Sequence, residues 1–391
     1  MKYNFDKVID RSGTSAEKVE GLKHIWGRTD LIPLWVADMD FATAPFVTDA
    51  IRKRCENEVL GYTGKPDSYY NAIINWVKQR YDLVVAKEMI NFVPGIVPGI
   101  GMAMNCFTQK GDKVMIQPPV YHPFAWVTTR NERTLVINPL RWENGMYRMD
   151  LDAFREQIKG CRRFILCNPH NPGGVVWTEA ELRAIADICY DEKVLVFSDE
   201  IHADLTLPPH THRPFATVSE KARMNSVTFM SPSKAFNMPG LSASHALIFN
   251  EDLRKRFRIY MDAGELDMGH VFAFLSVEAA YSHGTEWLDQ CLAYIQGNID
   301  FVDDFLKNHA PKIKAIRPEA SYLVWLDCRE LELSQKDLNE FFVDKAHLAL
   351  NDGEMFGKEG IGFMRLNVAS PRCIIEKAMK QLADAYQLYI K

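Results

Sequence analysis

The sequence lacks the features of membrane, nucleic-acid-binding and secreted proteins. Its apolar runs, such as residues 164–167, are far shorter than the roughly 20 residues that span a bilayer. Lysine and arginine number 46 against 51 aspartate and glutamate, a net charge of −5, so the basic surplus of a general nucleic-acid binder is missing. Residues 1–6 carry neither the apolar core nor the cleavage site of a secretory signal. We therefore expect a soluble, cytoplasmic protein.

Several signatures of binding sites are also missing. None of the eight cysteines forms a C-x-x-C pair, which argues against a zinc site, and most lie among apolar residues, as buried reduced thiols do. Neither G-x-G-x-x-G nor G-x-x-x-x-G-K-[ST] occurs, so the nucleotide-binding fingerprints are absent. His202, His210 and His212 have an irregular, proline-rich spacing that is a weak metal signal. No metal site is predicted.

What is present, up to about residue 285, is an alternation of short β-branched runs with longer helical patterns. This alternation predicts an α/β protein in which a mostly parallel sheet is covered by helices on both faces. We expect residues 41–285 to form this large domain. The predicted strands are residues 90–93, 113–117, 134–137, 164–167, 194–198, 226–229 and 245–249.

The pattern changes after residue 285, where a long helix is followed by two strands, a helix capped by Ser334 and a terminal helix from Pro371. This is typical of a smaller α+β domain. We expect residues 286–391 to form it together with residues 1–40, and a length of 391 residues fits two domains.

Polar side chains follow four of the predicted strands, and ligands of such sheets collect at the carboxyl ends of the strands. The segments are Gly95 to Gly99, Asn168 to Gly174, Ser198 to His202 and Ser231 to Asn237. Groups from four strand ends can therefore converge on one ligand.

Lys234 is the most informative of these residues. It follows a strand and has no acid near it in the sequence. A buried lysine loses its proton easily and becomes a nucleophile toward an aldehyde. Lowering a lysine pKa from about 10.4 toward 7 costs about 4–5 kcal/mol, which favours a functional reason for burial. The alternative is an ordinary lysine in a surface loop.

Asp199 ends an apolar strand, where a buried carboxylate needs a cationic partner such as a protonated pyridine nitrogen. Its alternative role is a helix N-cap. His202, three residues on, either hydrogen-bonds the same ligand or packs in the core.

The other candidate residues also have two interpretations each. Asn171 is a ligand or part of a turn, and Tyr121 stacks on a flat ring or packs in the core. The loop from Gly95 enters a helix whose first N–H groups can hold a phosphate. Arg365 has the planar fork that binds a carboxylate in two places, or it forms an ordinary ion pair.

The order of these motifs resembles fold-type I pyridoxal-phosphate (PLP) enzymes, the aspartate aminotransferase superfamily. The sequence motifs that carry the resemblance are Asn168-Pro169-His170-Asn171-Pro172, Asp199-Glu200-Ile201-His202 and Ser231-Pro232-Ser233-Lys234. Leu34 to Phe41 and Pro119 to Phe124 are further similar to the MalY/PatB branch of cystathionine β-lyases, or C–S lyases. The motifs extend from Tyr62 to Arg365, and the resemblance implies the PLP-dependent transferase fold with PLP as cofactor.

The resemblance also implies a role for each residue. Lys234 bonds to the aldehyde carbon of the coenzyme and later moves protons, and Asp199 pairs with the pyridine N–H. Asn171 and His202 hydrogen-bond the phenolate oxygen, and Tyr121 stacks on the ring. Arg365 and the backbone around Ala37 hold the substrate carboxylate, beside Asn171 and Tyr121. The phosphate contacts implied are Gly95, Ile96, Val97, Ser231 and Ser233.

Tyr62, in Gly61-Tyr62-Thr63-Gly64, resembles a residue that reaches the phosphate of the partner subunit, which implies a homodimer. Two positions depart from the family pattern. Many relatives have an arginine eight residues after the lysine, where this chain has Ser242. The turn after Asn171 ends in Gly173-Gly174, where relatives often have valine or threonine before the last glycine. These departures affect the part of the site that binds the phosphate.

Three functions are compatible with these residues. The first is a C–S β-lyase that cleaves L-cystathionine or another cysteine S-conjugate to pyruvate, ammonia and a thiol. The second is an aminotransferase acting on an amino acid and a 2-oxo acid. The third is a coenzyme-holding regulator that acts through a protein partner. The branch phrases favour the lyase, and the sequence does not identify the thiol part of its substrate.

Overall fold

The computed structural model describes residues 3–390. Its main sheet has seven strands and confirms the α/β prediction. Only β10 is antiparallel to its neighbours, and the other six strands run in one direction. In spatial order the strands are β2 (Ile90–Val93), β10 (Ser244–Leu247), β9 (Ser226–Met230), β8 (Leu195–Asp199), β7 (Arg163–Cys167), β3 (Lys113–Ile116) and β4 (Thr134–Ile137).

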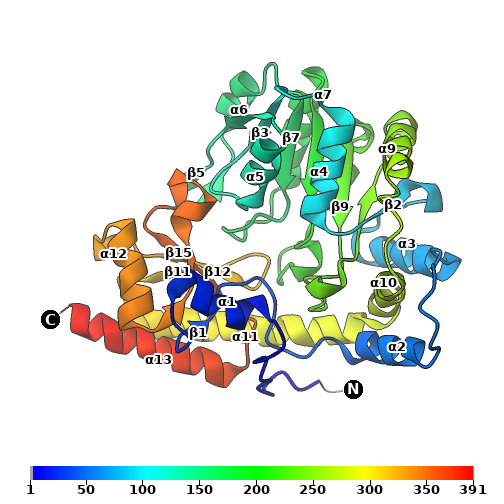
Figure 1. Ribbon diagram of the computed structural model, residues 1–391. Helices are drawn as coiled ribbons and strands as arrows, with labels where there is room; N and C mark the ends of the chain where they lie inside the picture. The colour runs from blue at the N-terminus through cyan, green and yellow to red at the C-terminus, as the bar shows by residue number, and fades with distance from the viewer. Residues whose placement is uncertain (1–2, 391) are drawn as a thin grey trace.

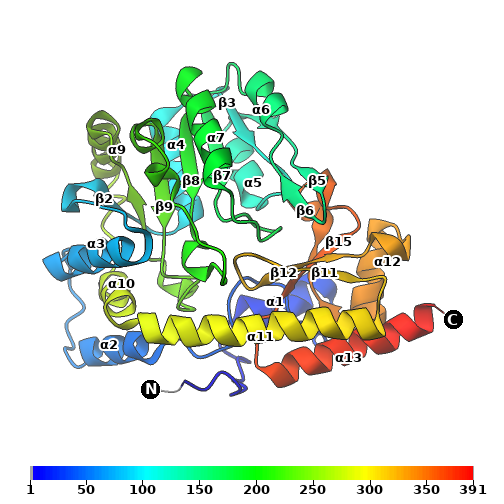
Figure 2. The ribbon, with the colours of Figure 1, turned by 180° about the vertical axis from the view of Figure 1, so that it is seen from behind.

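Helices cover both faces of this sheet (Figures 1 and 2). Side chains alternate along a strand, so Phe164 and Leu166 of β7 pack into a different apolar cluster from Ile165 and Cys167. This explains why the central strands carry apolar side chains on both faces. The covering helices are α4 (Ile96–Phe107), α5 (Pro123–Arg130) and α9 (Glu251–Ala263) on one face, and α6 (Leu151–Gln157), α7 (Glu179–Asp191) and α8 (Glu220–Met224) on the other.

The helix starts follow local sequence signals. At α7 the Thr178 hydroxyl accepts a hydrogen bond from the Glu181 N–H at 3.2 Å, and the Glu181 carboxylate accepts one from the Thr178 N–H at 2.8 Å. Thr43 does not cap α2 (Pro45–Cys55), because its hydroxyl donates instead to the Asn237 carbonyl at 2.7 Å. Two further helices, α3 (Asp67–Tyr81) and α10 (Val271–His283), pack beside one another, and α2 contacts α10.

A second, antiparallel sheet has the order β11 (Lys314–Ile316), β12 (Leu323–Asp327), β15 (Phe363–Asn367) and β14 (Asn351–Asp352). Near it, β1 (Ile32–Pro33) pairs with β13 (Leu348–Ala349), so the N-terminal segment joins the C-terminal part of the chain. In Figure 1, α11 (Thr285–His309) runs along the base of the molecule with α13 (Arg372–Tyr389) beside it. The remaining α-helices and strands of the described residues are α1 (Glu17–Trp26), α12 (Gln335–Glu340) and the hairpin of β5 (Arg141–Glu143) and β6 (Met146–Arg148).

Candidate active site

A cavity of about 200 Å³ lies at the carboxyl ends of β2, β7, β8 and β9. The structure brings ten of the predicted site residues together around it. Because β10 runs the opposite way, its first residue, Ser244, also lies at this edge and lines the cavity. The ten predicted residues are Ala37, Gly95, Ile96, Val97, Tyr121, Asn171, Asp199, His202, Ser233 and Lys234.

Lys234 points into the cavity and is not a surface-loop lysine. Its Nζ donates a hydrogen bond to the Ala37 carbonyl oxygen at 2.5 Å. Burial lowers the pKa of the amine to about 8, and the positive charge of Arg365 acts in the same direction, while Asp38 and Asp199 oppose it. A large share of the amine is therefore neutral, and able to act as a nucleophile, near pH 8.

Asp199 closes β8 with only 3% of its surface exposed. One carboxylate oxygen accepts a hydrogen bond from the Ile201 N–H at 3.1 Å, and no α-helix begins here, so the residue does not act as a helix cap. Burial raises the pKa of this carboxyl to about 7, although the Ile201 N–H and Lys234 lower it. Such an acid is stabilised by a cation placed against it, as a protonated pyridine nitrogen would be.

His202 lies beside Asp199 with its Nδ1 buried and without a hydrogen-bond partner. Burial first, then Lys234 and Arg365, lower the pKa of the ring to about 3, so the ring is neutral. A neutral imidazole with a free nitrogen can still exchange one hydrogen bond with an oxygen of a bound ligand. The side chain of Asn171 accepts a hydrogen bond from Arg365 Nη1 at 3.1 Å.

The part of the cavity lined by the start of α4 is suited to an anion. Helix α4 begins at Ile96 without a side-chain cap, and Gly95 has a φ of +149°, which side chains rarely adopt. The first N–H groups of a helix have no partner within it and attract anions. Ser233, Ser242 and Ser244 also line the cavity.

Ser231 lies outside the cavity lining. Its hydroxyl donates to the Ala243 carbonyl at 2.7 Å and accepts from the Ser233 N–H at 3.1 Å. It therefore fixes the loop that carries Ser233, and a direct phosphate contact from Ser231 stays a prediction.

Arg365 borders the cavity through its contact with Asn171 and is 3% exposed. Its Nη2 donates to the Trp35 carbonyl at 3.2 Å, and the guanidinium lies 4.8 Å from the centre of the Phe356 ring. Within residues 3–390 no carboxylate forms an ion pair with it, so the ion-pair interpretation is wrong. A buried guanidinium without an acid is suited to the carboxylate of a substrate.

Tyr62 does not reach this cavity. Its side chain is 98% exposed and lines a separate, open depression with Leu60, Met268 and His270. Whether it contacts a partner subunit stays a prediction.

The polar groups that line the cavity match the polar groups of PLP. A carboxyl without a cation, a histidine nitrogen without a partner and uncapped helix N–H groups correspond to the ring nitrogen, the phenolate oxygen and the phosphate of that molecule. Lys234 supplies the amine that an aldehyde requires.

The two glycines at 173 and 174, where the chain departs from the family pattern, have a steric reason. Gly174 has a φ of +68°, and a Cβ there would lie 2.4 Å from the Cβ of Pro318. A Cβ on Gly173 would lie 2.9 Å from the His170 ring. The turn that carries Asn171 is therefore packed directly against the loop before β12, which leaves no room for the valine or threonine of relatives.

Sequence reasoning missed several residues around the amine. The Tyr322 hydroxyl donates to the Ala37 carbonyl at 2.9 Å, and Asn237 and Asp38 fix the segment that carries Ala37. Asp38 belongs to a phrase that carries the resemblance, and Asn237 ends a segment that follows a predicted strand, which were the available signals. Tyr322 had no such signal, because it lies just before β12, far along the chain from these motifs.

The absences predicted from sequence can be compared with residues 3–390. No group of three or more metal-ligating side chains lies together there, and His212 instead pairs with Glu200 at 2.8 Å. No helix in that range is long and apolar enough to cross a bilayer. Cys55 and Cys373 are exposed, and the other six cysteines are buried. Cys167 lines the cavity, but burial raises the pKa of its thiol well above the usual value, so the thiol stays protonated.

We expect Asp199→Asn to stabilise the coenzyme-free protein at pH 8. The pKa of Asp199 rises on folding from 3.8 to about 7, so ionisation opposes folding increasingly as the pH rises from about 4 to 7. Each pKa unit corresponds to about 1.4 kcal/mol, so removing the charge should add up to about 4 kcal/mol to the free energy of unfolding. Urea unfolding at pH 8 and pH 4 measures the effect, which should vanish at pH 4. An equal effect at both pH values would contradict the assignment.

Comparison with known proteins places these features in a family. The model for "Aminotransferase class I and II" matches residues 29–382. Cystathionine beta-lyase PatB of Bacillus subtilis (strain 168) is 38% identical over 384 residues, which cover 98% of this chain and 99% of that protein. Protein MalY of Escherichia coli (strain K12) is 30% identical over 387 residues, 98% of each chain.

Among solved structures, cystalysin from Treponema denticola, which contains PLP, has a TM-score of 0.96 at 33% identity and covers 100% of both chains. These similarities confirm the resemblance to the MalY/PatB branch. The chain belongs to the class I and II aminotransferase family.

Proposed function

We propose that this chain is a PLP-dependent carbon–sulfur β-lyase that cleaves L-cystathionine or another cysteine S-conjugate to pyruvate, ammonia and a thiol. The observation that carries the proposal is one buried cavity with an amine of lowered pKa, Lys234, and a carboxyl without a cation, Asp199. The similarity to cystathionine beta-lyase PatB, over nearly the full length of both chains, supports the lyase reaction.

PLP, when bound, supplies an electrophilic aldehyde carbon and a ring that withdraws electrons from the substrate Cα. Lys234, with a pKa of about 8, would hold the aldehyde carbon until the amine of the substrate replaces it there. The freed Lys234 amine would then be placed to accept the proton that leaves Cα. The negative charge of Asp199 holds a proton on a neighbouring ring nitrogen. Once Cα has lost its proton, the bond between Cβ and sulfur can break and the thiolate leaves.

Substrate orientation falls to Arg365, whose fork binds the α-carboxylate beside Asn171. Tyr121 stacks on the coenzyme ring, and burial raises the pKa of its phenol, which therefore stays neutral. Asn171 and His202 bind the phenolate oxygen. The N–H groups of Ile96 and Val97, with Gly95 and Ser233, hold the phosphate without an arginine at position 242.

We also propose that the protein is a homodimer with shared active sites. Val59, Leu60 and Tyr62 are 71%, 59% and 98% exposed on one segment, and apolar side chains gathered in this way are typical of a surface covered by a partner. Tyr62 then reaches the phosphate in the other subunit. A large domain of residues 41–285, a small domain of residues 1–40 and 286–391, and a cytoplasmic location remain predictions from the sequence.

The alternative is an aminotransferase, because the family model describes that activity and the cavity holds the groups that both reactions need. We expect purified protein with PLP to form pyruvate from L-cystathionine without any 2-oxo acid, because elimination regenerates the coenzyme. Pyruvate is measured with lactate dehydrogenase, and L-alanine, which has no leaving group on Cβ, is the control. Turnover only with 2-oxoglutarate present would identify the aminotransferase instead.

Lys234→Ala should abolish turnover and the visible absorbance of the lysine-bound coenzyme, because no other amine lines the cavity among the described residues. We expect a loss of at least about 1,000-fold in kcat, as for removal of a group that acts both as nucleophile and as proton acceptor. Absorbance spectra and pyruvate release measure both effects. A variant that stays yellow and active would show that a different lysine holds the coenzyme.

Tyr62→Ala and Lys234→Ala, inactive or weak alone, should complement each other when they are mixed and allowed to exchange subunits. A hybrid dimer carries one site with the native Lys234 of one subunit and the native Tyr62 of the other. Random exchange should restore about a quarter of the wild-type activity. No recovery in proven hybrids would show that Tyr62 acts within its own subunit or not at all.

A further inference from the structure

Segment 35–41 contributes to the active site through its backbone. It lies between β1 and α2 and forms neither helix nor strand. The Trp35 carbonyl accepts a hydrogen bond from Arg365 at 3.2 Å, and the Ala37 carbonyl accepts one from Lys234 at 2.5 Å. The positions of these carbonyls depend on the contacts that fix the segment. Those contacts therefore also determine where the Lys234 amine is held.

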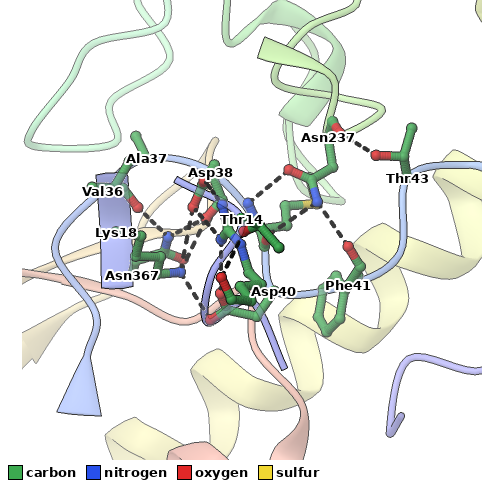
Figure 3. A network of polar contacts seen from close by, with 12 residues as sticks. Thr14, Lys18, Val36, Ala37, Asp38, Asp40, Phe41, Thr43, Asn237 and Asn367 are labelled. Atoms are coloured by element: carbon green, nitrogen blue, oxygen red, sulfur yellow. Dashed lines mark hydrogen bonds and ion pairs between the residues drawn. The ribbon is translucent and has the colours of Figure 1, made fainter. Parts of the chain in front are cut away.

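Asn237 is one of the groups that fix it, and Figure 3 shows its contacts. Its Oδ1 accepts a hydrogen bond from the Met39 N–H at 3.0 Å. Its Nδ2 donates to the carbonyls of Met39 at 3.0 Å and Phe41 at 2.7 Å. Both amide hydrogens and the amide oxygen are therefore used on the segment, and the Asn237 carbonyl accepts a further bond from Thr43.

The other side of the segment is held from β15. Asn367 donates to the carbonyls of Val36 and Asp38, each at 2.7 Å. Asn237 follows Lys234 by three residues and Asn367 follows Arg365 by two. The loop with the amine and the strand with the guanidinium are thus tied to the same segment by one asparagine each.

A buried charge cluster fixes the outer end. Lys18 is fully buried, and its Nζ lies 2.8 Å from a carboxylate oxygen of Asp40 and 3.3 Å from the Asp38 carbonyl. Arg11 pairs with the Asp38 carboxylate at 2.6 Å. Asn237 fixes Met39 and Phe41 on either side of Asp40, while Asn367 and the Tyr322 hydroxyl hold the part around Ala37.

We propose that Asn237 is a positioning residue that helps to hold segment 35–41 so that the Ala37 carbonyl orients the amine of Lys234 for proton transfer. Asn237 does not line the cavity itself, so it acts through the segment. This inference rests on the proposed function for its kinetic consequence, while the placement of the amine can be tested without coenzyme.

The backbone of Asn237 makes a clean test possible. Its φ is +52°, a conformation that asparagine and glycine tolerate better than other residues. Asn237→Gly therefore removes three side-chain hydrogen bonds without straining the backbone. Asn144→Gly is the matched control, because Asn144 has a φ of +51° in the exposed turn between β5 and β6, far along the chain from the site.

The first measurement uses the coenzyme-free protein. Reductive methylation with formaldehyde, followed by peptide mass spectrometry, reports how fast Lys234 reacts. Loss of the Ala37 contact frees the amine and disfavours its charged form, so we expect Asn237→Gly to label about threefold faster or more. The Asn144→Gly variant should label like the wild type.

The second measurement uses the PLP-loaded enzyme with L-cystathionine. We expect kcat to fall about 10- to 100-fold in Asn237→Gly, because a misplaced amine transfers protons poorly, while KM changes less than about threefold. A merely structural role would lower the melting temperature and leave both labelling and kcat unchanged. That result, in a folded variant with full coenzyme content, would overturn the proposal.

If Asn237→Gly fails to fold, Asn237→Ser decides the question. Serine is tolerated at a φ of +47° elsewhere in this chain, at Ser242, and its hydroxyl can replace one of the lost donors. We expect labelling and kcat between those of the wild type and the glycine variant, and wild-type values would overturn the proposal. If the wild type itself releases no pyruvate, the proposed function fails, but the labelling comparison still tests Asn237.

Discussion

The joint burial of Lys234 and Asp199 is the constraint on which the active site depends. Burial disfavours charge, so it lowers the pKa of the amine to about 8 and raises that of the carboxyl to about 7. Burial therefore makes the Lys234 amine a nucleophile, and the buried Asp199 carboxyl is stabilised by a cation placed against it. The sheet provides the burial, because strands apolar on both faces end together at one edge of the molecule.

At this edge of the sheet, the loops that carry the reactive groups are held in place by the surrounding structure. The groups that line the cavity come from loops, but each loop is anchored by contacts beyond the cavity. Segment 35–41 is the clearest case, since an asparagine from the loop after β9, another from β15 and a buried lysine hold it (Figure 3). Such support matters, because a displacement of the reacting groups by about 1 Å can cost about 100-fold in rate.

Lyase and aminotransferase chemistry require the same amine, acid and carboxylate-binding arginine. After the Cα proton is removed, the substrate decides part of the outcome, because only a leaving group on Cβ permits elimination. The protein also influences which reaction occurs, because the position of Lys234 determines which atom can receive the proton. The orientation of that amine is thus the feature of this chain most closely linked to the type of reaction.

The sequence alone determined the architecture and most of the candidate site. Apolar runs and capping residues are local signals, and they predicted all seven strands of the main sheet to within about two residues. Motifs at strand ends predicted which side chains share the cavity, because parallel strands bring their carboxyl ends to one edge. Tertiary structure alone decided that Ser231 braces a loop, that Thr43 binds Asn237, and that Ser244 and Tyr322 join the site. These outcomes depend on strand direction and on contacts between residues far apart in the chain, for which a local pattern carries no signal.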